Sequence, residues 1–270
     1  GSHVAAGWGA ADYAAPEWTA ALRESLLAKA ETGLILPRTV VGSALHTWGV
    51  QRAAARIVYD IAPRLDLTPG WNAIQARRSS RTWSSHRRKF KKLSELGEIS
   101  VVRVRDEASL HKWLPAVFAL YRARASAVGR TGLWTRPDGQ RFLREWMTAL
   151  AGEGTLDLSI LVVGAFPVAF TFGIRDPEDY YLYGLGFDPK SEFARWSPGE
   201  HLLVDIMKEA AESGLKTFDF LVGDEPYKSA WADQNRQVET LVFAGGKIKQ
   251  SFLAVWPRAR QYARSTWRSK

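Results

Sequence analysis

The chain has 270 residues, 46% of them apolar and 24% charged, which is typical of a folded globular protein and excludes a wholly disordered or fibrous chain. It contains no cysteine, and this excludes disulfide bonds, thiolate metal sites and cysteine nucleophiles. No apolar run is long enough to cross a bilayer, so we expect no transmembrane segment and a cytoplasmic protein.

Positive charge is concentrated in two segments of the chain. Eight basic residues and no acidic residue lie between Arg77 and Lys92, and seven more basic residues, again without an acid, lie between Lys247 and Lys270. The net charge is +9, so the rest of the chain carries −6. Such stripes suit a polyanionic partner, such as a phosphate-rich cofactor, RNA or an anionic membrane surface. The alternative is that the two basic segments are simply the solvent-exposed faces of two helices.

The first quarter of the chain gives few clear patterns. Residues 1–3 resemble what remains of a cleaved affinity tag and are set aside. Within residues 4–69 we expect a helix at 17–32, strands at 34–41 and 56–61, and a connector rich in Pro and Gly at 62–70. We interpret residues 4–69 as a short N-terminal partial half-domain.

The pattern is clearer from residue 70 to residue 246, which we interpret as one domain. We expect a long helix at 72–96, a strand at 99–104, a helix at 109–128 and a third helix with Asp138 as its N-cap. The elements that follow are strands at 156–163, 166–174 and 180–187, a helix at 199–213, a strand at 217–222, a loop or single helical turn at 223–232, and a strand at 237–244. Residues 247–270 are expected to form a basic C-terminal helix.

The order of these elements from Ile99 onward is β-α-α-β-β-β-α-β-α-β. A run of antiparallel strands leads into a β-α-β unit, so the pattern predicts an α/β (α+β) protein with a mixed sheet. The same order is that of the GNAT acyltransferase fold.

One polar stretch lies between a predicted strand and a predicted helix, and its sequence is Arg195-Trp196-Ser197-Pro198-Gly199-Glu200-His201. Free amides at a helix N-terminus, together with the helix dipole, attract anions. Gly199 allows close backbone approach, Ser197 is expected to cap the helix and Arg195 adds charge. We predict a site for a donor phosphate here, formed by Arg195, Ser197, Gly199, Glu200 and His201. The alternative is an ordinary helix start, which would explain the tripeptide Ser197-Pro198-Gly199 without any bound phosphate.

A second polar stretch runs from Phe218 to Lys228, where a buried strand leads into a turn. Asp224 or Glu225 is our candidate base for an attacking amine, and Lys228 or Tyr227 our candidate to stabilise an oxyanion or to protonate a leaving group. The alternative is a purely structural role, in which Asp219 and Asp224 anchor the turn and Lys228 lies in solvent.

The histidines and the interleaved basic and aromatic residues are two further groups with possible chemistry. The five histidines show no metal-ligand spacing, and Asp205 is expected to pair with His201 on one helix face. Basic residues with aromatic residues between them favour RNA. The RNA-binding candidates are Arg77, Arg78, Arg81, Trp83, Arg87, Arg88, Lys89, Lys91 and Lys92.

Several of these stretches together resemble a known family. They are the segments 62–67, 86–90, 187–189 and 197–199, and the run from Phe218 to Lys228 followed by Trp231. From about residue 63 to residue 244 the chain resembles the BioF2-like, cellulose-biosynthesis-protein-like acetyltransferase domain of the GNAT superfamily. It is more distantly similar to the FemABX peptidyltransferases.

This resemblance implies transfer of an acyl group to an amine, with no metal and no tightly bound cofactor. GNAT enzymes take the acyl group from acyl-CoA, and FemABX enzymes take an aminoacyl group from charged tRNA. Tyr227 and Lys228 match the aromatic-Lys pair of FemABX enzymes, and Gly199 matches the helix start at which GNAT enzymes bind pyrophosphate. The GNAT phosphate loop has more glycines than the one found here.

We favour aminoacyl-tRNA as the donor, because of the two basic stripes and the single glycine, and a small-molecule or peptidyl amine as the acceptor. The first alternative is an N-acetyltransferase that uses acyl-CoA. The second is a GNAT-like domain that binds RNA or an anionic surface without catalysis.

Overall fold

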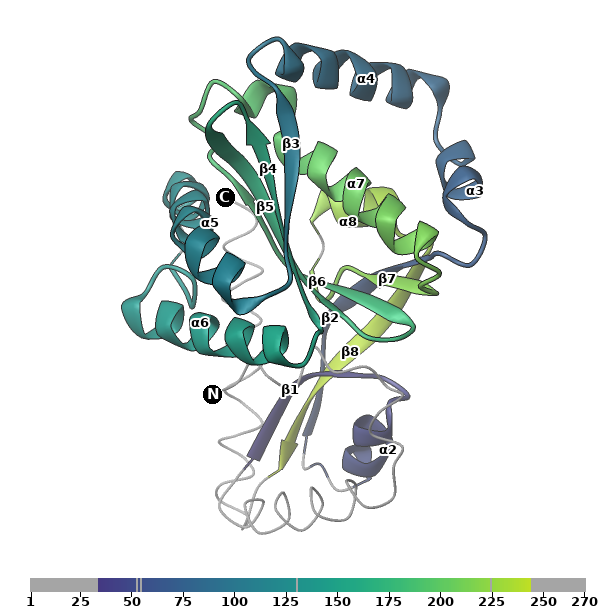
Figure 1. Ribbon diagram of the computed structural model, residues 1–270. Helices are drawn as coiled ribbons and strands as arrows, with labels where there is room; N and C mark the ends of the chain where they lie inside the picture. The colour runs from purple at the N-terminus through teal and green to yellow at the C-terminus, as the bar shows by residue number, and fades with distance from the viewer. Residues whose placement is uncertain (1–33, 52, 54, 130, 224, 244–270) are drawn as a thin grey trace. The chain divides into compact units, whose positions relative to one another are not determined.

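A computed structural model describes residues 34–243, except residues 52, 54, 130 and 224 (Figure 1). The expected helices at 17–32 and 247–270 lie outside the described residues, so they stay predictions, as does the partial half-domain. The chain divides into two compact units, Asp66–Asp219 and a second one made of Gly1–Leu65 with Phe220–Lys270.

The larger unit contains five strands in the order β7-β6-β5-β4-β3. Strands β3 to β6 pair antiparallel, and β6 and β7 pair parallel, so the mixed sheet is confirmed. The strands are β3 (Ile99–Val104), β4 (Leu156–Val163), β5 (Phe166–Arg175), β6 (Asp179–Phe187) and β7 (Thr217–Asp219). β4 is buried at all eight positions, as expected of a central strand covered on both faces.

Helices cover both faces of this sheet. α5 (Glu107–Ala127) and α6 (Pro137–Gly152) lie on one face, and α7 (Pro198–Glu212) lies on the other (Figure 1). The core between the sheet and the helices α5 and α6 is rich in aliphatic and aromatic side chains, among them Leu114, Leu143, Met147, Phe170 and Phe172. The predicted order of elements from Ile99 onward is confirmed, with α8 and β8 as its last two members.

The single helix expected at 72–96 is wrong, because the structure has two helices there. α3 (Trp71–Ala76) and α4 (Ser80–Ser94) are separated at Ser79. The hydroxyl of Ser79 accepts a hydrogen bond of 3.2 Å from the amide of Thr82 and so caps a new helix.

The N-cap expected at Asp138 is also wrong. Arg136 occupies the cap position of α6, and Pro137 is the first helical residue, where its fixed φ and missing N–H are tolerated. Asp138 lies in the first turn and pairs with Arg136. The hydrogen bond from Arg136 lowers the pKa of the Asp138 carboxyl to about 2.

The smaller unit contains three antiparallel strands in the order β1-β8-β2. Its elements are β1 (Leu34–Val40), α2 (Ala44–Val50), β2 (Ala55–Asp66), α8 (Pro226–Trp231) and β8 (Gln234–Phe243). Trp48 of α2 packs on Phe243, with ring centroids 5.8 Å apart.

Two expected boundaries near this unit are wrong. β2 continues to Asp66, although its end was expected to be a connector, because Pro63 still pairs with Asn235 and its carbonyl accepts a hydrogen bond of 3.0 Å from the amide of Phe220. β7 ends at Asp219, before the expected end at residue 222.

Candidate active site

The start of α7 is the first of the predicted sites. Ser197 holds the N-cap position in a left-handed conformation, with φ 56° and ψ 52°, and its carbonyl accepts hydrogen bonds from the amides of Glu200 (3.0 Å) and His201 (3.2 Å). Its hydroxyl makes no capping hydrogen bond, so the expected capping role is wrong. Instead, Ser197 Oγ accepts a hydrogen bond of 2.9 Å from Lys89 Nζ of α4.

Gly199, in the first turn of α7, is buried against β6. A Cβ atom at this position would lie 3.2 Å from Phe187 Cδ1 and 3.4 Å from Leu185 Cδ2, so glycine lets the helix start pack closely on the strand. Its amide is also one of the N–H groups that a helix start cannot satisfy within the helix. The first turn of α7 therefore has the features of an anion site.

Three cations lie near this helix start. Lys89 Nζ is 3.7 Å from Glu200 Oε2. Burial lowers the pKa of the Arg78 guanidinium, and the charge of Glu200 raises it, which places Arg78 within electrostatic reach of Glu200. Arg195 is exposed, and its guanidinium lies 5.1 Å from the ring centroid of Trp196. Positive charge exceeds negative charge here.

A pair of histidines also joins α4 to α7. His201 Nδ1 and His86 Nε2 are 2.9 Å apart. Burial lowers the pKa of both imidazoles, that of His201 to about 4, so both are neutral at pH 7. Sequence reasoning missed this pair, because 115 positions separate its members. The expected pairing of His201 with Asp205 is wrong, since Asp205 pairs with Arg103 at 2.5 Å.

α4 presents an exposed basic face to solvent. We use this name for the five exposed basic residues of the helix, Arg81, Arg87, Arg88, Lys91 and Lys92. Lys92 also pairs with Glu95 at 2.8 Å. Arg77 is exposed just before the helix, whereas Lys89 points inward to Ser197.

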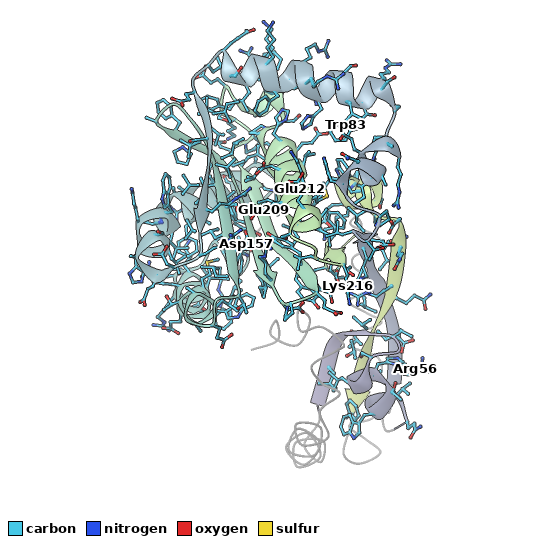
Figure 2. All side chains as sticks on the ribbon, turned by 45° about the vertical axis from the view of Figure 1, so that its right-hand side comes forward. Arg56, Trp83, Asp157, Glu209, Glu212 and Lys216 are labelled. Carbon is cyan, nitrogen blue, oxygen red and sulfur yellow. The ribbon has the colours of Figure 1, made fainter. Side chains whose placement is uncertain are left out.

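Trp83 does not belong to the basic face. It lies on the inner side of α4 (Figure 2), where its Nε1 donates a hydrogen bond of 2.9 Å to the carbonyl of Gln75. Its ring meets Trp71 edge-on at 6.2 Å and His86 edge-on at 5.5 Å. These contacts hold α3 and α4 together.

The parallel pairing of β6 with β7 covers only three residue pairs and ends at Tyr181 and Asp219. β6 itself continues to Phe187, so its outer edge extends well past the last pair with β7. A bulge follows at once: Phe172 pairs with Gly184 but Gly173 pairs with Leu182, which leaves Tyr183 as the extra residue. Bulges of this kind disrupt the ladder locally and are common beside active sites.

The second predicted site lies in the smaller unit. Lys228 is buried in α8, and its Nζ donates a hydrogen bond of 3.0 Å to the carbonyl of Val222 and lies 3.0 Å from Glu225 Oε2. The solvated Lys228 of the structural alternative is therefore wrong. In the turn before α8, Leu221 has a positive φ of 56°, a strained conformation for a branched residue. Tyr227 is half-buried and meets Phe220 edge-on at 6.4 Å.

Asp224, the other candidate base, lies outside the described residues. Gly223 has a φ of 145°, and a Cβ atom there would lie 2.2 Å from Glu225 Oε2 and 2.8 Å from Lys228 Nζ. The turn therefore requires glycine to bring this ion pair together.

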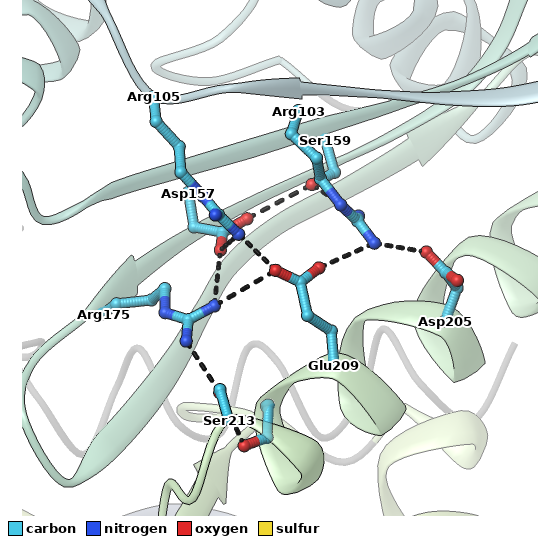
Figure 3. A network of polar contacts seen from close by, with 9 residues as sticks. Arg103, Arg105, Asp157, Ser159, Arg175, Asp205, Glu209 and Ser213 are labelled. Carbon is cyan, nitrogen blue, oxygen red and sulfur yellow. Dashed lines mark hydrogen bonds and ion pairs between the residues drawn. The ribbon is translucent and has the colours of Figure 1, made fainter.

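A network of ion pairs fixes α7 to the sheet (Figure 3). The carboxylate of Asp157, buried in β4, lies 3.2 Å from Arg105 and 3.4 Å from Arg175. Glu209 of α7 pairs with both arginines and, at 2.7 Å, with Arg103. Sequence reasoning missed the network, whose members come from four elements. It holds the helix whose first turn is the predicted phosphate site.

Within residues 34–243, gaps excepted, no group of three or more His, Asp and Glu side chains is arranged to hold a metal ion. None of the helices described there is long and apolar enough to span a membrane.

Comparison with known proteins identifies the family to which this fold belongs. A family model described as the acetyltransferase (GNAT) domain matches residues 79–229, more than half of the chain. A search of curated protein sequences gives no match.

Three solved structures share the fold, all at low sequence identity. FemX has a TM-score of 0.59 and 15% identity, over 86% of this chain and 78% of its own. The C-terminal domain of a protein assigned as a lysylphosphatidylglycerol synthetase from Agrobacterium fabrum has a TM-score of 0.55 and 9% identity, over 87% and 73%. L-PGS from Bacillus licheniformis has a TM-score of 0.55 and 11% identity, over 86% and 75%.

Proposed function

Since the chain belongs to the GNAT acetyltransferase family and is an acyltransferase, we propose that it takes an aminoacyl group from aminoacyl-tRNA and forms an amide bond on an amine. The acceptor in this proposal is a small-molecule or peptidyl amine. FemABX enzymes, which the sequence resembles, use the same donor class. One structural neighbour is also named as a synthetase of lysylphosphatidylglycerol, a phospholipid that carries a lysyl group.

The observation that carries the proposal is the contact between the basic helix and the start of α7. Lys89 binds Ser197, and His86 binds His201, so α4 is held where the donor phosphate is expected. The five exposed basic residues lie on the same helix as Lys89. A nucleic acid with one phosphate bound at α7 would therefore find further cations on this helix for its other phosphates, which are more numerous than those of CoA.

In the proposed reaction the neutral amine nitrogen attacks the ester carbonyl carbon of the aminoacyl group. The new C–N bond forms, the bond to the ribose oxygen breaks, and the proton lost by the amine ends on that oxygen. Lys228 stabilises the oxyanion that develops on the carbonyl. Tyr227 lies beside it in sequence and would pass a proton to the leaving oxygen while it takes up the amine proton from the base.

The ion pair in the smaller unit favours one division of roles between the two acids. Glu225 lies 3.0 Å from Lys228 and balances its charge. Glu225 is therefore already engaged as the partner of this buried cation. This leaves Asp224 as the proposed base and Glu225 as the residue that positions Lys228.

Acyl-CoA is the second candidate donor, and one observation favours it. The outer edge of β6 extends past its pairing with β7, next to the Tyr183 bulge. An extended chain that carries amides can add to such an edge through backbone hydrogen bonds. The pantetheine arm of CoA is a chain of this kind.

Binding measurements across a salt series separate the two donors. We expect bulk aminoacylated tRNA to bind, with an affinity that falls steeply as salt rises, and CoA to bind weakly in calorimetry. Micromolar CoA binding without tRNA binding would contradict the proposal and assign an acyl-CoA enzyme. Replacement of the five basic-face residues by Gln is the matched control, since it should weaken tRNA binding alone.

A further inference from the structure

Two exposed phenylalanines flank the segment that leads into α7. Among the described residues five large apolar side chains are exposed, and Phe90 (41%) and Phe166 (64%) are the aromatic ones. Phe166 begins β5, directly after the turn that joins it to β4, and Phe90 lies on α4. An exposed aromatic ring is a surface on which a nucleic-acid base can stack.

Both rings contact the same short segment, residues 193–201. The Phe166 ring lies 6.2 Å from the ring of Phe193, at the beginning of the segment. The Phe90 ring lies 5.2 Å from the ring of His201, at its end. Ser197, which binds Lys89, lies between these two contacts. Along the chain, the proposed phosphate site therefore lies between the two residues that the exposed rings contact.

Positive charge accompanies the rings. Phe90 follows Arg87 by three positions on the helix, which makes them neighbours on its surface. Arg195, within the segment, is also exposed. A surface that alternates exposed rings with cations, around a helix N-terminus, matches the chemistry of single-stranded nucleic acid, whose bases stack on rings while its phosphates meet cations.

We infer that Phe90 and Phe166 stack on unpaired bases at the 3′ end of a tRNA acceptor arm while Lys89 and the first turn of α7 bind a phosphate between them. This inference rests on the proposed function and names the part of the donor that the site recognises. CoA would use the phosphate site without needing two rings, so the rings select the nucleic acid donor.

The test uses uncharged RNA, so that it does not depend on catalysis. The probes are a fluorescein-labelled RNA hairpin with the acceptor-stem sequence and a single-stranded ACCA end, and the same hairpin with a blunt end. The variants of the full chain are Phe90→Leu and Phe166→Leu, alone and combined, which keep an apolar side chain but remove the ring. Val128→Ala, at an apolar residue that is 59% exposed, is the control.

Stacking on a protein ring contributes about 1 kcal/mol or more per base, equivalent to about fivefold in Kd. We therefore expect fluorescence anisotropy to show tighter binding of the ACCA hairpin than of the blunt one by the wild-type protein. Each Phe→Leu change should weaken ACCA binding about fivefold, the double change should remove the preference, and Val128→Ala should leave it unchanged. Blunt-hairpin affinity should be the same in all variants.

Equal binding of both hairpins by the wild-type protein, or ACCA binding that survives the double change, would overturn the inference. If aminoacyl transfer from tRNA were still observed, the proposed function would stand without it. Failure to bind either hairpin, together with CoA binding, would overturn both. Loss of binding to phosphatidylglycerol vesicles in the double variant, with RNA binding intact, would assign the rings to a lipid surface and also overturn the inference.

Discussion

Lys89 Nζ donates a hydrogen bond of 2.9 Å to Ser197 Oγ, although the two residues are 108 positions apart. Through this contact α4, the most basic of the described helices, reaches the left-handed residue from which α7 starts. Five basic residues of α4 face solvent, and this one faces the helix start. The contact gives Lys89 a role that differs from that of its neighbours.

Replacement of Lys89 by Met should weaken donor binding. A charge-assisted hydrogen bond to a phosphate is worth about 1.5–3 kcal/mol, so we expect KM for the donor to rise about tenfold or more and kcat to stay within about twofold. Steady-state kinetics with varied donor concentration measure both. Lys208→Met is the matched control, because Lys208 of α7 is exposed, pairs with Glu212 and lies outside the basic face. An unchanged donor KM in Lys89→Met would contradict the assignment.

Replacement of Lys228 by Ala should act on the chemical step. Loss of one group that stabilises an oxyanion typically lowers kcat about 100-fold or more, and we expect a fall of this size with donor KM little changed. Ser229→Ala, one position along α8 at an exposed residue, should retain full activity. Circular dichroism must show the same fold in both variants. Turnover at the wild-type rate in folded Lys228→Ala would exclude a catalytic role.

Stability should depend on pH through His201. Burial lowers the pKa of this imidazole from 6.5 to about 4, so between these values the unfolded chain binds a proton that the folded chain does not. Acid therefore favours unfolding, and the stabilising contribution is present above pH 6.5 and lost as the pH falls toward 4. The full effect is about 3 kcal/mol at most.

Urea unfolding of wild-type protein and of His201→Gln, between pH 7.5 and pH 4.5, tests this dependence. The free energy of unfolding of the wild type should fall more steeply with acid than that of the variant, which lacks the titrating group. Parallel curves would show that His201 titrates normally in the folded protein.

Asp157→Asn should destabilise the larger unit. Removal of one partner from a buried ion pair costs about 3–5 kcal/mol, and because Arg105 and Arg175 both reach solvent we expect about 2–3 kcal/mol. Chemical unfolding measures the change. Glu95→Gln, which breaks the exposed pair with Lys92, should have an effect below about 1 kcal/mol. Equal effects of the two changes would show that the network adds no stability.

Most of the larger unit could be predicted from the sequence. The strands β3 and β4 have the expected ends, because turns at Gly97 and Gly164 define them, and the chain order from Ile99 onward is confirmed. The helix break at Ser79 was missed, because a serine within a polar helical pattern is recognisable as a cap only when its hydroxyl is seen to accept from Thr82.

The candidate site could be predicted only in its local parts. Proline, glycine and the polar run after Leu221 mark the two stretches, but no sequence rule reaches from Lys89 to Ser197 or from His86 to His201. Pairs of this kind come from tertiary packing. Burial also excludes the solvated Lys228 of the structural alternative, since Lys228 is held inside the protein by contacts with Val222 and Glu225.

The most direct test of the proposed function is transfer of a labelled acyl group to a panel of small-molecule and peptidyl amines. Two donors should be compared at equal concentration, bulk tRNA charged with radiolabelled amino acids and radiolabelled acetyl-CoA, with wild-type protein and Lys228→Ala. We expect amide-linked label from the charged tRNA alone, and only with the wild-type protein. Label from acetyl-CoA alone would contradict the tRNA donor and assign the enzyme to the acyl-CoA class.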